Sequence, residues 1–355
     1  ERYYAQFCRE LIYTPAGRRL SSNRYIRMAQ RGWHALWEHV LQKEARNLLA
    51  LARARRVGAL WFGYGNISFP LIKAVKAIEP EIKVVCDTDS VWSRFVLREL
   101  PFQPNPFRRW MIKRRGERKR WEEQEWVKLC EVTTAVSEVD TDYYRALVRD
   151  PARICVFSNV IDLDSYTNPP APAPDVRRPN IYLAGTFGRY HSPMDVAARW
   201  MLSDVLPRVR KDVPDVHFYI VGRDSDRSLG HLNDTGVSVK GKISSVLPYL
   251  CYADVSVVPL KFESGTRFKI LEAAACEVPI VSTTLGAEGL PVVNGEHLLI
   301  ADDAESFANA IVSLIRDRAL ATRLRNNCRE LVRTRYSLDH LADEARTILE
   351  DLNHG

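Results

Sequence analysis

The sequence predicts an α/β protein made of two doubly wound, Rossmann-like parallel-sheet domains with a cleft between them. The second half alternates helical segments with short, almost continuously apolar segments, which is typical of strands covered on both faces. The first half repeats this alternation more loosely, and a proline-rich segment, 167–179, separates the halves. Parallel sheets bind ligands at the carboxyl ends of their strands, so we expect a ligand in the cleft.

The elements of the second half follow from this alternation. Helices are expected at 244–252, at 267–276 and from 194 towards 212, the last ending near Pro207 because proline interrupts a helix. The expected strands are 180–187, 216–222, 237–241, 253–260 and 278–283.

The first half contains four clear strand candidates and one weaker candidate at 10–15. Amphipathic helices are expected at 303–317 and 337–352. We divide the chain into a first Rossmann-like domain (1–158), a hinge (159–179), a second Rossmann-like domain (180–335) and a C-terminal helix (336–355) that could cross back to the first domain. The four clear strand candidates are 58–63, 82–87, 131–137 and 153–158.

Composition excludes several classes of protein. The chain has 355 residues, 46% of them apolar and 27% charged, which is typical of a soluble globular protein. No apolar run approaches the roughly 18 residues of a membrane helix. The seven cysteines are scattered without metal-ligand spacing, and the histidines show none either, so we expect buried reduced thiols, a cytoplasmic location and no metal.

One short segment carries most of the functional signal. Glu272 lies in an apolar helix pattern, where a carboxylate is costly unless something binds it. Ser264, Gly265 and Thr266 precede that helix, whose free amides suit a diphosphate. Arg267 and Lys269 add positive charge. The alternatives are an ordinary capped helix and a glutamate satisfied by a local arginine or amide.

This segment belongs to an ordered set of motifs that resembles the retaining GT-B glycosyltransferases of family four. The set includes HFYIVGR, SGTRFKILEAAACEVPIVSTTLGAEGL and GEHLLIADD, with CDTDSVWSR and FSNVIDLD in the first half. The resemblance implies a nucleoside-diphosphate-sugar donor on the second domain. It also implies that Glu272 is the second glutamate of the E-x7-E motif, bound to the donor ribose hydroxyls. Ser264 stands where the first glutamate belongs, and Glu263 is one position off.

The resemblance extends to other donor-site residues. Arg189 matches the family's arginine after the first strand of the donor domain, and with Arg267 it would bind the diphosphate. The lysine that usually follows is absent. The family needs no metal or cofactor beyond the donor co-substrate. The remaining donor-binding candidates line the same loops: Gly188, Gly222, Arg223, Gly241, Lys242, Ser264, Gly265, Thr266 and Lys269.

In the first domain Asp87 and Asp89 follow a strand, where either could orient an acceptor hydroxyl or take its proton. The alternative is that they are turn or helix-cap residues. The family's Gly-rich first turn is missing and the chain opens on Glu1, so we expect one or two strands of this domain to be absent from the sequence.

The segment 107–121 is strongly basic and contains Trp110, Met111 and Trp121. It fits a helix on an anionic membrane surface, where each basic residue contributes about 1 kcal/mol. The alternative is a solvated helix whose tryptophans pack inward. No nucleic-acid module is recognisable, so we expect no nucleic-acid partner.

We therefore expect a metal-independent, retaining hexosyltransferase that transfers a sugar to a hydroxyl of a glycan or lipid-linked glycan. It would be cytoplasmic and could be peripheral on the inner face of the membrane. One alternative is a GT-B nucleotide-sugar 2-epimerase, which needs no acceptor. The other is a non-catalytic glycosyltransferase-like binding domain, which would show no turnover.

Overall fold

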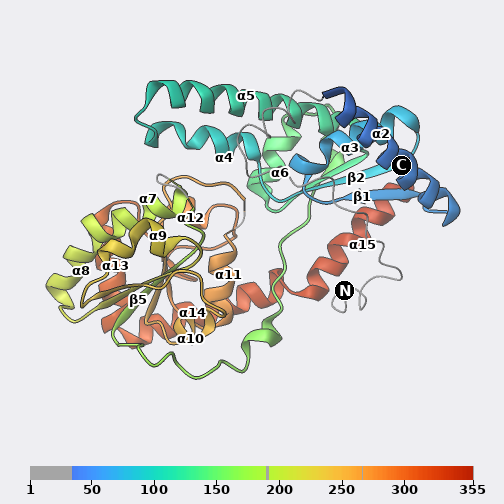
Figure 1. Cartoon of the computed structure of the whole chain (residues 1–355). Helices are drawn as coiled ribbons and strands as arrows, with labels where there is room; N and C mark the ends of the chain where they lie inside the picture. The colour runs from blue at the N-terminus through green and yellow to red at the C-terminus, as the bar shows by residue number, and fades with distance from the viewer. Residues whose placement is uncertain (1–33, 189–191, 266, 355) are drawn as a thin grey trace.

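The computed structural model describes residues 34–188, 192–265 and 267–354. It contains two separate, wholly parallel sheets, each accompanied by helices (Figure 1). The α/β fold with two parallel sheets is the one that the sequence predicts. The strand candidate at 10–15 lies outside the described residues.

The first sheet has four strands in the order β1-β2-β3-β4. Each of the four clear strand candidates forms; one is shifted by one residue and the other three are shortened by two or three: β1 (Ala59–Phe62), β2 (Lys83–Thr88), β3 (Val132–Ala135) and β4 (Ile154–Val156). The helices of this part are α2 (His34–Ala54), α3 (Gly65–Ile78), α4 (Trp92–Arg98), α5 (Pro106–Leu129) and α6 (Glu138–Arg145).

The second sheet has six strands in the order β10-β9-β8-β5-β6-β7. Its strands are β5 (Asn180–Ala184), β6 (His217–Val221), β7 (Val237–Val239), β8 (Val255–Val258), β9 (Ile280–Ser282) and β10 (Leu299–Ile300). Its helices are α7 (Pro193–Trp200), α8 (Leu206–Asp212), α9 (Ser225–Leu229), α10 (Leu247–Leu250), α11 (Phe268–Ala275), α12 (Thr284–Ala287), α13 (Ala304–Arg316) and α14 (Arg318–Arg335).

The helix expected to end near Pro207 continues to Asp212, so that boundary is wrong. A π-helical turn, Met201–Val205, joins α7 to α8 and places Pro207 in the first turn of α8. Proline is tolerated there because the first turn of a helix does not use its amide groups in helical hydrogen bonds.

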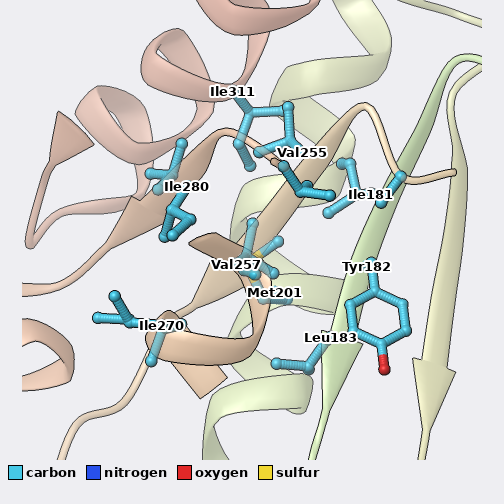
Figure 2. Packing of buried hydrophobic residues seen from close by; sticks show 14 of the residues in the cluster. Ile181, Tyr182, Leu183, Met201, Val255, Val257, Ile270, Ile280 and Ile311 are labelled. Atoms are coloured by element: carbon cyan, nitrogen blue, oxygen red, sulfur yellow. The ribbon is translucent and has the colours of Figure 1, made fainter. Parts of the chain in front are cut away.

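The core of the second sheet explains its continuous apolar strands. All four residues of β8 are buried, and Ile181, Ile280 and Ile311 pack around them from β5, β9 and α13 (Figure 2). Burial on both faces fixes the sheet between two helical layers, so the carboxyl ends of its strands form a firm edge.

Two segments connect the halves. The proline-rich segment lies along the second half, where Tyr252 donates to the carbonyl of Pro170 at 2.9 Å and Tyr219 donates to the carbonyl of Asp175 at 2.6 Å. The second is the last helix, α15 (Leu338–His354), whose Ile348 and Leu352 pack with residues of β2 and β3 (Figure 1).

Candidate functional site

The candidate donor residues gather at the carboxyl edge of the second sheet because its strands are all parallel. Gly222 follows β6, and a Cβ placed there would lie 1.8 Å from the carbonyl oxygen of Gly185, which follows β5. Gly222 also has a φ of 135°, so only glycine allows these two loops to touch. The amide of Gly222 donates to the carbonyl of Gly241 after β7 at 2.8 Å. Three strand ends are thereby joined.

The predicted residues around this edge differ in exposure. Gly241 is buried at a φ of 63°, and its amide donates to Ser225 Oγ at 3.0 Å. Gly188, Arg223 and Lys242 are exposed. Arg189 and Thr266 lie outside the described residues, so the expected pairing of Arg189 with Arg267 stays a prediction.

The loop after β8 leads into α11 and contains two buried polar atoms that lack a partner. These are Ser264 Oγ and Arg267 Nε, for which no described residue supplies a hydrogen bond. The Arg267 guanidinium is nearly fully buried and donates to the carbonyls of Gly265 and, at 3.4 Å, Leu285. Burial lowers its pKa, although Glu263 and other nearby carboxylates oppose this. Buried polar atoms are normally satisfied, so these two are available to a ligand.

Glu272 and Lys269, both on α11, are close enough for their charges to affect each other. Burial raises the pKa of the Glu272 carboxyl above its ordinary value, and the charge of Lys269 opposes that rise. Burial also lowers the pKa of Lys269, while Glu263 raises it. Neither side chain forms an ion pair within 4 Å of another described residue. A half-buried carboxylate without a close cation can accept hydrogen bonds from a ligand hydroxyl.

The first sheet presents Asp89 directly to this loop. A Cβ placed on Gly265 would lie 2.7 Å from the carbonyl oxygen of Asp89, so the two backbones are in close contact. The Asp89 side chain is exposed and accepts from Trp92 Nε1 at 3.2 Å. Asp87 instead accepts from Thr134 Oγ1 at 2.8 Å, and burial raises its pKa. The structure therefore brings Asp89, more than Asp87, to the donor loop.

An ion-pair network that sequence reasoning missed joins the two halves. Glu288, after α12, pairs with Arg94 and, at 2.8 Å, with Arg98, both on α4. Arg98 also donates to the carbonyl of Glu263 at 2.7 Å, and Arg94 pairs with Asp140 at 3.2 Å. Burial raises the pKa of Glu288. The hydrogen bond and charge of Arg98, together with the charges of Arg94 and Arg267, outweigh this effect, so the pKa of Glu288 is below its ordinary value. We call this group the interdomain network.

The basic segment forms the N-terminal part of α5, a long helix beside α4 (Figure 1). Phe107, Trp110, Met111 and Trp121 are each at least half exposed. The alternative in which the tryptophans pack inward is therefore wrong. Phe107 and Trp110 stack with ring centroids 6.0 Å apart, and Arg114 lies 5.5 Å from the Trp110 ring.

Among the described residues, no group of three or more histidine, cysteine, aspartate or glutamate side chains is arranged to hold a metal ion. None of the helices in the described part of the chain is long and apolar enough to cross a membrane.

Comparisons with known proteins show which family the second half resembles. The family model described as "Glycosyl transferases group 1" matches residues 182–317. A lipopolysaccharide core biosynthesis glycosyltransferase (LpsE) of Rhizobium meliloti is 30% identical over 139 residues, which are 37% of this chain and 41% of the relative. A phosphatidyl-myo-inositol mannosyltransferase of Mycobacterium leprae is 29% identical over 205 residues, 54% of this chain and 52% of the relative. The matches thus span about half or less of these relatives.

Solved structures extend the similarity to both sheets. A glycosyltransferase from Rickettsia africae matches with a TM-score of 0.65 at 14% identity, covering 96% of this chain and 84% of that one. Anabaena HepE in complex with UDP matches with a TM-score of 0.61 at 13% identity, covering 88% of this chain and 82% of that one. Both likenesses concern the fold. Residues 182–317 therefore match the glycosyl transferases group 1 model, and the chain has the fold of the GT-B glycosyltransferases.

Proposed function

We propose that this protein is a retaining glycosyltransferase that moves a hexose from a nucleoside-diphosphate sugar to a hydroxyl of a glycan or lipid-linked glycan. One observation carries the proposal. At the start of α11, Ser264 Oγ and Arg267 Nε are buried without a described partner, and further along the helix the half-buried Glu272 carboxylate forms no ion pair within 4 Å with a described residue. Ser264 adjoins Gly265, whose backbone contacts the Asp89 carbonyl. Such groups are costly unless a polar ligand binds them.

The donor would occupy this edge in a defined orientation. The Glu272 carboxylate would accept hydrogen bonds from the ribose hydroxyls, and these charge-assisted bonds offset the cost of its burial. The diphosphate would lie at the amino end of α11, where Arg267 and the free amides oppose its negative charge. HepE, a structural neighbour, was solved in complex with UDP, which supports a nucleotide-containing ligand.

The chemistry then needs little from protein side chains beyond charge and position. The acceptor hydroxyl would attack the sugar on the face that the diphosphate leaves, and an oxygen of the departing phosphate would take its proton. Arg267, with Arg189, would stabilise the charge that develops on the leaving group. Asp89 would orient the acceptor, since it is exposed beside the donor loop. No metal or further cofactor is assigned a role.

Two observations favour an acceptor at a membrane. The relatives named above act, by their names, in lipopolysaccharide core biosynthesis and on phosphatidyl-myo-inositol. The exposed aromatic and basic side chains of α5 suit the headgroup region of an anionic bilayer. We propose a cytoplasmic enzyme that binds the inner face of the membrane through residues 107–121.

Donor binding is tested first by thermal unfolding with UDP-, GDP-, dTDP- and CMP-sugars. A ligand at about 100 times its Kd adds about 2.7 kcal/mol, a shift of several degrees. We expect one nucleotide class to raise the Tm, Glu272→Ala to abolish that rise, and Glu305→Ala, an exposed change on α13, to keep it. If no donor shifts the folded wild-type protein, the donor site is refuted and the binding-domain alternative stands.

Transfer and membrane binding need separate assays. Release of the nucleoside diphosphate should depend on an added acceptor, because an epimerase would turn over without one. Sedimentation with vesicles should show binding to anionic but not to zwitterionic lipid, weakened in Trp110→Ala and unchanged in Trp200→Phe, a change in the other half. Equal binding to both kinds of vesicle, or to neither, would refute the membrane surface.

A further inference from the structure

Two cysteines that are far apart in the sequence lie together at the end of α11. Cys251 Sγ and Cys276 Sγ are 3.2 Å apart, although the residues are separated by 25 positions. Cys251 follows α10, and Cys276 directly follows the last residue of α11. Both are free and half-buried. A disulfide needs a sulfur–sulfur distance of about 2.05 Å, so a movement of about 1 Å would join them.

The environment of this pair favours reaction of Cys251. The hydrogen bond between the two sulfurs lowers the pKa of the Cys251 thiol, although burial opposes this. The thiolate is the nucleophilic form, so the hydrogen bond increases the reactive fraction of Cys251 and leaves Cys276 protonated as the second thiol. Cys86 and Cys130 also interact through a sulfur hydrogen bond, but both are buried, as is Cys328, whereas Cys251 and Cys276 are only half-buried.

Small oxidants can reach the pair. Cys251 lines a cavity of about 680 Å³ that also borders Arg178, Arg318 and Arg325. Asp254, which pairs with Arg178, and Glu277 border the same cavity, so its lining is polar and carries both charges. The cavity lies by the C-terminal end of α11, since Glu277 and Val278 also line it, and Glu272 stands one helical turn earlier.

We propose that Cys251 and Cys276 form a reversible disulfide and that this pair is an oxidation site of the protein. The Cys251 thiolate attacks one oxygen of hydrogen peroxide and breaks the O–O bond, giving a sulfenic acid and hydroxide. The Cys276 sulfur then attacks the sulfenic sulfur, loses its proton and displaces water. Sulfur loses two electrons in total and the peroxide gains them. A dithiol reductant reverses the reaction by thiol–disulfide exchange.

Disulfide formation would also act on the donor site. The Cys276 amide donates to the carbonyl of Glu272 at 3.0 Å, so a movement of Cys276 displaces the last turn of α11. Burial is the main cause of the raised pKa of Tyr182, and the charges of Glu272, Cys276 and Cys251 raise it further. These four residues therefore lie close to one another. This second effect rests on the proposed function, whereas disulfide formation does not.

Mass spectrometry of the full chain treated with hydrogen peroxide tests the site. We expect a loss of about 2 Da, a cross-linked peptide that contains both cysteines, and reversal by dithiothreitol. Cys251→Ser and Cys276→Ser should each prevent the cross-link, and Cys155→Ser, a half-buried cysteine elsewhere, should not. If both thiols remain alkylatable in the folded wild-type protein while Cys155 oxidises, the proposal is wrong.

Donor affinity, measured on the oxidised and reduced protein, separates the two levels. A several-fold change in Kd that is absent in Cys276→Ser would support the coupling to α11. A cross-link that forms without any change in Kd would overturn the coupling and leave the oxidation site. If neither form binds any donor, the proposed function fails while the cross-link result stands.

Discussion

The interdomain network gives the sharpest prediction, because one substitution removes both of its ion pairs between the halves. Glu288→Gln keeps the size of the side chain but removes the charge that pairs with Arg94 and Arg98. The two arginines then face each other without a shared anion. We expect the contact between α4 and the loop after α12 to open more often, while each sheet keeps its own core.

The magnitude follows from the exposure of these side chains. Glu288 and Arg94 are each 21% exposed and Arg98 is 26% exposed, so the pairs are neither surface nor fully buried. Surface pairs contribute about 0.2–1 kcal/mol, and breaking a buried pair costs about 3–5 kcal/mol. We therefore expect local opening to become easier by about 1–3 kcal/mol, which speeds amide exchange roughly 5- to 150-fold.

Hydrogen exchange of peptides covering 89–98 and 284–290 measures this opening. Glu138→Gln is the matched control, because it removes an exposed pair with Arg145 on α6 and should change exchange less than about fivefold. The folded pKa of Glu288 is depressed, so its contribution is complete above the unfolded value of about 4.3 and disappears as pH falls through the folded value. Exchange in both peptides that is unchanged at pH 7 would refute the reasoning.

The other predictions concern three further positions. Gly265→Ala should weaken donor binding at least tenfold, by titration calorimetry, because it places a Cβ 2.7 Å from the Asp89 carbonyl at a φ of 83°; unaltered affinity would contradict the close contact. Because the pKa of Glu272 is raised, donor affinity should fall as the pH drops through this pKa and the carboxylate becomes protonated. Glu272→Gln should remove this pH dependence. Glu123→Gln should lower stability by about 1–3 kcal/mol in thermal unfolding, because the buried carboxylate accepts from the Ser93 amide at 2.9 Å; an unchanged Tm would contradict this.

The sheets were predictable because their residues carry a local signal. Strands buried on both faces are apolar throughout, and β8 could be read directly from Val255–Val258. The end of the helix at 194–212 was not predictable, because proline permits two outcomes. It ends a regular helix, but after a π-helical turn it fits the first turn of the next one.

Contacts made across the chain left no local signal. Cys251 and Cys276 have no motif spacing, and only the packing of α10 beside α11 brings their sulfurs together. Glu288 lies in the second half, yet its partners Arg94 and Arg98 lie in the first. Sequence periodicity describes one element at a time, so it cannot identify side chains that meet through the approach of two sheets.

The missing first glutamate of the family motif illustrates the same limit. Ser264 stands at the position of the first motif glutamate. Its hydroxyl is buried and lacks a described partner, so a polar group remains there but the negative charge of the glutamate is lost. Glu288 does not replace that charge, because Arg94 and Arg98 already bind it. Glu263 stays half-buried without an ion pair to a described residue, and burial raises its pKa while Arg267 and Lys269 lower it. Although serine replaces the motif glutamate, the carboxylate of Glu263 lies one residue from the original position. A motif of fixed spacing, such as E-x7-E, does not match a carboxylate that is shifted by one residue.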